Sequence, residues 1–249
     1  MTTELDWHWA TQTSGEISSA QRRALLGRLF RALPTMIGDA IKTRTGRRGQ
    51  GRVEFGSISV PDSALALAAE QEARDSVTPH VLEHSYRTYF FGKALAALDG
   101  VAVDDELVYV ASLLHDLQLE HPTPGRCFAV VGGERAAQFV RDQGVPEARA
   151  EAVGAAIAAH ITLGASDNLA DPGGFVSAGA GTDVFGLRLS DLDATWLDEL
   201  LQRHPRLEFK RHMLAAWAAE GAAVPAGRAA WLTRYAAFPL LIRAAPFSE

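Results

Sequence analysis

The spacing of apolar residues predicts helices along almost the whole chain. Leu25, Leu29, Phe30 and Leu33 recur at intervals of three and four residues, which places them on one face of a helix. Convincing alternation of apolar and polar residues is absent, and 51–60 is only a weak candidate for a strand. The pattern therefore predicts an all-α fold.

Capping residues, prolines and glycines divide this pattern into successive elements. Serine or aspartate precedes several apolar runs, and glycine follows the ends of others, as at helix termini. We expect Pro34 to interrupt the first helix, because proline lacks the N–H that a helix interior uses. The predicted helices are 20–33, 35–42, 62–75, 79–99, 105–119, 134–143, 147–163, 182–189, 190–204, 210–220 and 228–243, and the predicted irregular segments are 1–17, 43–56 and 165–181.

The chain of 249 residues is long enough for a closed core and contains neither an internal repeat nor a recognisable linker. The simplest division is a helical N-terminal extension with a basic loop, 1–60, followed by one helical domain, 61–249.

Composition narrows the functional classes. The net charge of −6 gives no broad basic field for nucleic acid. The single cysteine, Cys127, excludes an internal disulfide framework and a cysteine-rich zinc site. No apolar run approaches the roughly 20 residues of a membrane span, and the N-terminus lacks the features of a signal peptide. We therefore expect a cytoplasmic protein with a small-molecule partner; a homo-oligomer stays open.

The most informative stretch is the apolar run Ala111–Leu119, which contains His115 and Asp116. Burying an ionised carboxylate is costly unless it is paired or bound to a metal. His84, on the preceding predicted helix, supplies a second imidazole, and this donor set suits Zn, Fe, Mn or Ni. The alternative without a metal is an ion pair between Asp116 and Arg87.

A further acidic ligand is expected from a distant helix, and Asp183, Asp191 and Asp193 are the candidates. Asp191 and Asp193 directly precede a helical pattern, where capping accounts for them. Asp183 has apolar neighbours and so has the greater need of a buried partner. We assign Asp183 as the distal ligand.

Four segments in this order resemble the HD-domain metal-dependent hydrolases: 84–87 (His-Ser-Tyr-Arg), 113–117 (Leu-Leu-His-Asp-Leu), 132–136 and 156–160. Segments 84–92 and 197–207 are similar to the cyanamide hydratase-like branch. The resemblance implies an HD-type helical domain that holds one divalent transition metal and no organic cofactor. The chain departs from the commonest family pattern at Gln118, where glycine is usual, which affects the expected shape of the pocket beyond the ligands.

The function expected from this resemblance is hydrolysis by metal-activated water. Asp116 is the expected ligand and proton acceptor. His160 is either an acid–base group or a second-metal ligand, with a role at the helix terminus as the alternative. Arg87 either orients a ligand carboxylate or binds an anionic substrate. His80 and His121 receive no role, and His204 and His212 are interpreted as surface residues.

A phosphohydrolase acting on a small phosphate ester or nucleotide is the leading prediction, although no glycine-rich phosphate loop is present. The alternatives are hydration of a small nitrile such as cyanamide, and a non-catalytic HD module that senses a ligand.

Overall fold

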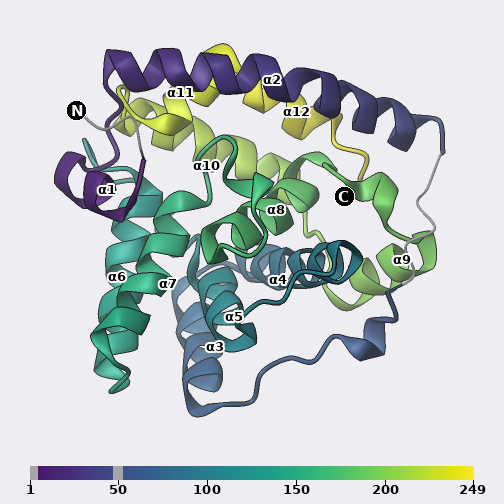
Figure 1. Ribbon diagram of the computed structural model, residues 1–249, viewed down its shortest axis with the longest axis horizontal. Coiled ribbons are helices and arrows are strands. Elements are labelled where there is room, and N and C mark those ends of the chain that lie inside the picture. The colour runs from purple at the N-terminus through teal and green to yellow at the C-terminus, as the bar shows by residue number, and fades with distance from the viewer. Residues whose placement is uncertain (1–4, 47–52) are drawn as a thin grey trace.

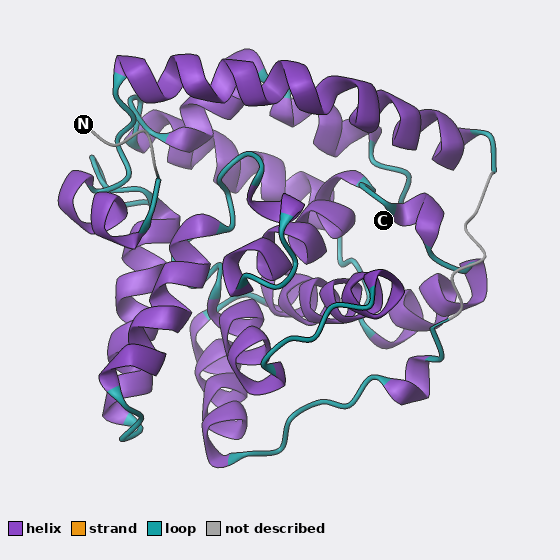
Figure 2. Cartoon of the chain, viewed as in Figure 1, coloured by secondary structure: helices purple, strands orange, loops and turns teal. Residues whose placement is uncertain are grey.

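The computed structural model describes residues 5–46 and 53–249. Every regular element in these two ranges is helical, which confirms the all-α prediction (Figure 2). The helices are α1 (Trp7–Thr13), α2 (Ser19–Arg44), α3 (Ala64–Ser76), α4 (Pro79–Asp99), α5 (Asp105–Leu114), α6 (Phe128–Asp142), α7 (Glu147–Ala159), α8 (Pro172–Phe185), α9 (Ala194–Arg203), α10 (Phe209–Ala223), α11 (Arg228–Tyr235) and α12 (Phe238–Ala244), with short 3-10 helices η1 (Phe55–Ser57), η2 (Ala165–Asp167) and η3 (Leu189–Asp191).

The centre of the molecule is built by α4, α5 and α8, with α6 and α7 paired to one side and α2 running along another (Figure 1). α4 is apolar around most of its circumference and is buried accordingly, with Tyr89, Phe91 and Leu95 in the same core cluster as Leu114 of α5 and Phe175 of α8. Its boundaries agree with the prediction, since Pro79 stands at its first turn and Gly100 ends it in a left-handed conformation. This core fixes the helices that carry the candidate ligands relative to one another.

The prediction of an irregular segment at 165–181 was wrong for residues 172–181, which belong to α8. Asp171 caps α8 by accepting a hydrogen bond from the backbone N–H of Gly174 (3.1 Å), and the helix continues to Phe185. A Cβ atom at Gly179 would lie 2.0 Å from the carbonyl oxygen of Thr88 on α4. The glycines that suggested turns therefore allow two helix backbones to pack closely, and 182–185 is the last turn of this helix.

The same effect explains the late start predicted for α6, which begins at Phe128 instead of residue 134. A Cβ atom at Gly133 would lie 2.6 Å from the carbonyl oxygen of Gly154 on α7, so this glycine is a contact point between helices. α7 itself ends at Ala159, four residues earlier than predicted, and leaves His160 as its C-cap.

The two ends of the chain also differ from the predictions. α1 lies within the segment predicted to be irregular, and Asp6 caps it. α2 continues through Pro34, which is exposed, although proline has no N–H to donate to the helix. The predicted helix 228–243 is instead two helices, separated at Ala237, which adopts a positive φ of 51°. Residues 53–60 contain η1 and no strand, while 47–52 lie outside the described residues.

The N-terminal segment packs against the C-terminal helices. Trp9 and Leu25 share a core cluster with Trp231, Leu232 and Ile242. The backbone N–H of Ile17 donates to the carbonyl oxygen of Ala226 (3.0 Å). The division at residue 60 stays a prediction. No helix in the described part of the chain combines the length and apolarity needed to cross a membrane.

Candidate metal centre

His115 and Asp116 lie immediately after the C-terminus of α5, and not within a helix as predicted. α5 ends at Leu114, and His115 is its C-cap with right-handed helical dihedral angles, so the pair continues the direction of the helix into a turn. Both side chains are buried, with 0% of His115 and 4% of Asp116 exposed.

Two of the nearby imidazoles are oriented by backbone carbonyl groups. Nδ1 of His115 lies 2.7 Å from the carbonyl oxygen of Ser112, and Nδ1 of His160 lies 2.6 Å from that of Ile157. A carbonyl oxygen only accepts hydrogen bonds, so each Nδ1 carries the proton and donates it. When either ring is neutral, its Nε2 therefore offers a free lone pair.

His84 is oriented in the same way by a carboxylate. Its Nδ1 lies 2.7 Å from Oδ2 of Asp183 on α8, and its ring stacks on Phe209 of α10 with a centroid separation of 4.5 Å. A metal-binding histidine characteristically donates its second ring N–H to a carboxylate or carbonyl group, which fixes the ring and its tautomer.

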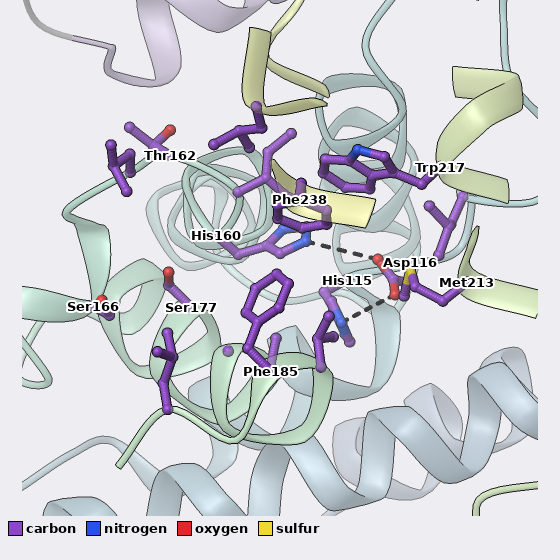
Figure 3. A pocket seen from close by; sticks show the side chains of 18 of the residues that line it. His115, Asp116, His160, Thr162, Ser166, Ser177, Phe185, Met213, Trp217 and Phe238 are labelled. Atoms are coloured by element: carbon purple, nitrogen blue, oxygen red, sulfur yellow. Dashed lines mark ion pairs between the residues drawn. The ribbon is translucent and has the colours of Figure 1, made fainter. Parts of the chain in front are cut away.

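The three Nε2 atoms converge on Asp116. Nε2 of His84 and Nε2 of His115 are 3.2 Å apart, and they lie 3.5 Å and 3.3 Å from Oδ2 of Asp116. Nε2 of His160 lies 3.7 Å from Oδ1 of the same carboxylate (Figure 3). Facing lone pairs repel unless a positive charge lies between them. The ligand atoms of His84, His115 and Asp116 all lie within 4.8 Å of one another, so this donor set fits a divalent transition metal.

The electrostatic environment supports the same interpretation. Burial alone would raise the pKa of Asp116, but the neighbouring histidines, His115 foremost, outweigh it and lower the pKa, so the group is a carboxylate. Burial lowers the pKa of His84, and it lowers that of His160 to about 3. Burial also opposes a charge on His115, but Asp116 outweighs burial and raises its pKa. In the described part of the chain, histidines are the only residues that form ion-pair contacts with Asp116.

Asp183 lies behind His84 and is held by two arginines. Its Oδ1 accepts hydrogen bonds from Nε of Arg87 (2.8 Å) and Nη1 of Arg206 (2.7 Å), and its Oδ2 accepts one from Nη2 of Arg87 (2.9 Å). The predicted fourth ligand is therefore beside the centre, in contact with one of its histidines. Asp191 instead pairs with Arg188, and Asp193 caps α9 by accepting from the N–H of Thr195, so neither lies in this group.

Arg87 is paired with Asp183 and not with Asp116, the partner considered from the sequence. Its Nη1 also donates to the carbonyl oxygen of Pro205 (2.8 Å). Sequence reasoning missed Arg206, which is buried beside Asp183. The signal in the sequence was its position within segment 197–207, the segment that is similar to the cyanamide hydratase-like branch.

A cavity of about 130 Å³ adjoins His115, Asp116 and His160. Its other walls are mostly apolar, and neither lysine nor arginine lines it among the residues that the structure describes. Figure 3 shows Phe185, Met213, Trp217 and Phe238 around the opening that leads to the carboxylate. These side chains come from α8, α10 and α12, whose approach to the centre was not predictable from local sequence.

Residues 81–194 match the family model of the HD domain. This part of the chain is an HD domain. The matched range contains all four predicted ligands, and it confirms the resemblance to the HD-domain metal-dependent hydrolases at the level of the superfamily. No curated protein sequence is similar enough to count as a relative. The cyanamide hydratase-like branch stays a prediction.

Proposed function

We propose that this HD-domain protein is a metal-dependent hydrolase or hydratase with a single divalent transition metal. The observation that carries the proposal is the buried carboxylate of Asp116, which faces Nε2 of three imidazoles and, among the residues that the structure describes, forms no ion pair with an arginine or lysine. An ion held there would lower the pKa of bound water from 15.7 toward about 7 and so supply hydroxide near neutral pH.

We assign His84, His115 and Asp116 as ligands. Asp183, the predicted fourth ligand, contacts Nδ1 of His84, so it would reach an ion on the Nε2 side only by turning away from that ring. Arg87 and Arg206 hold the Asp183 carboxylate in place, and we assign Arg87 this orienting role because it does not line the cavity. Elemental analysis of Asp183→Asn separates direct ligation from support of His84. The amide still accepts a hydrogen bond from His84 but is a poor ligand, so direct ligation predicts loss of metal. Retention of stoichiometric metal in this variant overturns the fourth ligand.

His160 is the proposed proton acceptor. Its Nε2 lies beside Oδ1 of Asp116 at the cavity wall. Nδ1 is occupied by the carbonyl oxygen of Ile157, so Nε2 is the atom available to take a proton from water and return it to the substrate.

The cavity supports a small, neutral substrate, and we propose a nitrile of the cyanamide class. Binding sites for drug-sized ligands usually measure about 300–1,000 Å³, whereas this cavity measures about 130 Å³. In hydration, the water oxygen bonds to the nitrile carbon, and both water protons end on the nitrogen, giving an amide. His160 would carry one of these protons from oxygen to nitrogen.

The phosphohydrolase prediction is the second candidate. Against it, two arginines that follow the His-Asp pair in the sequence are engaged in ion pairs, Arg126 with Glu134 and Arg135 with Glu72. In its favour, a groove of about 680 Å³ between α2 and α8 is lined by Arg28 and Arg31 and shares Leu163 with the cavity. A phosphate-bearing substrate would therefore have to enter from that side.

A substrate panel tests both candidates on protein whose metal content has been measured. Small nitriles, including cyanamide, are assayed for amide or urea formation, and phosphomonoesters and nucleotides for phosphate release. We expect amide formation that is lost in Asp116→Asn and strongly reduced in His160→Gln. Phosphate release without nitrile turnover would reverse the order of the candidates, and a protein that binds no metal and turns over neither class would favour the ligand-sensing module.

A further inference from the structure

A second group of metal-ligating side chains lies close to the proposed centre. His80, Glu120 and His212 offer ligand atoms that all lie within 4.8 Å of one another. His80 is one helical turn before His84 on α4, or about 6 Å along the axis at 1.5 Å per residue. Glu120 ends the turn that begins with His115, and His212 lies on α10. None of the three belongs to the first group.

The contacts within this group resemble a site prepared for a cation. Nε2 of His80 lies 2.9 Å from Oε1 of Glu120, and the hydroxyl of Thr78 donates to Oε2 of the same carboxylate (2.6 Å). The rings of His80 and His212 stack with a centroid separation of 3.9 Å and an angle of 16°. Glu120 is thus already fixed by two neighbours on α4, and the second imidazole is held against the first.

The protonation states also suit a transition metal. His80 is 8% exposed, and its burial lowers its pKa, so the ring is neutral near pH 7 and can offer a nitrogen lone pair. Arg211 lies near the group, with Nη2 3.2 Å from Nε2 of His212. Arg211 is exposed and also pairs with Glu208, so its guanidinium can leave His212 without losing a buried contact. Two imidazoles and one carboxylate are an established ligand set for zinc.

We propose that His80, Glu120 and His212 form a second divalent-cation site, selective for Zn²⁺ and similar transition metals. The site connects α4, the turn that carries His115 and Asp116, and α10. α10 also supplies Met213 and Trp217 to the cavity wall. An ion at this site restrains that wall relative to the helix that carries His84.

The test is a calorimetric titration of Zn²⁺ into the untagged full chain after removal of bound metal, together with thermal melting. We expect the wild type to bind two ions and His212→Ala to bind one. Glu120→Gln should weaken the same binding event at least tenfold. His121→Ala is the matched control, because His121 is exposed, adjoins Glu120 and lies outside the group.

Asp116→Asn distinguishes this site from the proposed function. The ion lost in His212→Ala should still bind to Asp116→Asn and should still raise its melting temperature. If the wild type binds one ion that only Asp116→Asn loses, or if His212→Ala and Glu120→Gln both retain two ions, the second site is overturned. If the wild type binds one ion that only His212→Ala loses, the second site stands and the proposed metal centre fails. Far-ultraviolet circular dichroism checks that each variant is folded.

Discussion

Asp116 combines a buried negative charge with a lack of fixed positive partners, and this combination determines how its variants should behave. Within the described residues, the carboxylate forms ion pairs only with histidines, whereas Asp183, at Nδ1 of His84, is held by two guanidinium groups. Replacing the two aspartates therefore has different effects. Without Asp116, the centre loses the negative charge that attracts a cation. Without Asp183, the guanidinium groups of Arg87 and Arg206 lose their partner.

For Asp116→Asn we expect metal affinity to fall by more than about 100-fold, beyond the range for residues that only support ligands. In the metal-free protein we expect a smaller loss of stability than in Asp183→Ala, because the amide leaves no buried guanidinium group without its partner. Elemental analysis and urea denaturation measure the two effects. An Asp116→Asn protein that keeps its metal would contradict the assignment of this residue as a ligand.

For Asp183→Ala we expect a loss of about 3–5 kcal/mol in the free energy of unfolding, since Arg87 and Arg206 remain buried without their carboxylate. Asp191→Ala is the control, because it removes a partly exposed pair with Arg188 worth about 0–1 kcal/mol. Urea denaturation of the metal-free proteins gives both values. Equal losses in the two variants would show that Asp183 is not the anchor of these arginines.

Glu220 gives a prediction for pH. It is buried on α10, where Oε1 accepts a hydrogen bond from the N–H of Phe128, and burial raises its pKa above the usual 4.5. The native state thus holds the proton more tightly than the unfolded chain does, so this group stabilises the fold fully below pH 4.5 and loses its contribution as the pH rises through the native pKa. Glu220→Gln cannot lose a proton and keeps the acceptor.

The stability of Glu220→Gln relative to the wild type should therefore increase as the pH rises from about 4.5 to 8, as measured by urea denaturation at each pH. Glu208→Gln, at an exposed position, should show no such trend. A difference that is constant with pH would contradict the raised pKa.

At the scale of elements, the sequence predicts the helix boundaries that depend on residues within one turn of the boundary. α4 was predicted at both ends because Pro79 and Gly100 act within one turn of the helix. α8 was missed because Gly179 serves a contact with Thr88, far away in the sequence, and a glycine gives no local indication of such a contact. The candidate ligands were found from charges in apolar surroundings, whereas Arg206 and the aromatic walls of the cavity depend on tertiary packing.

Gly179→Ala tests this account of α8. Its Cβ atom would lie 2.0 Å from the carbonyl oxygen of Thr88, so α4 and α8 must separate, and we expect a loss of about 3 kcal/mol or more in the free energy of unfolding. Gly27→Ala in α2 is the matched control, since its Cβ atom meets nothing within 4 Å. There we expect a gain of about 0.5–1 kcal/mol from the higher helix propensity of alanine. Thermal or urea unfolding compares them, and a neutral Gly179→Ala would contradict the close approach.

At the scale of the whole molecule, the proposed centre joins helices that are distant in sequence. His84 comes from α4, His115 and Asp116 follow α5, and Asp183 comes from α8. An ion bound to the native state but not to the unfolded chain stabilises the native state by mass action. We therefore expect a chelator to lower the melting temperature of the wild type by several degrees and to leave Asp116→Asn/His212→Ala unchanged, as measured by differential scanning calorimetry. An unchanged wild type would contradict both proposed metal sites.

The contact between the N-terminal helix α1 and the C-terminal helix α11 has a consequence for folding during synthesis on the ribosome. Trp9 lies over the guanidinium of Arg228, and Glu16 forms a β-bridge with Gly227, so the first described helix is completed by residues made more than 200 positions later. A ribosome releases the chain from its N-terminus, so Arg228 and Gly227 emerge only after the HD domain has been made. The side of Trp9 that Arg228 covers must therefore wait uncovered, and a chaperone that binds nascent chains has its longest opportunity there.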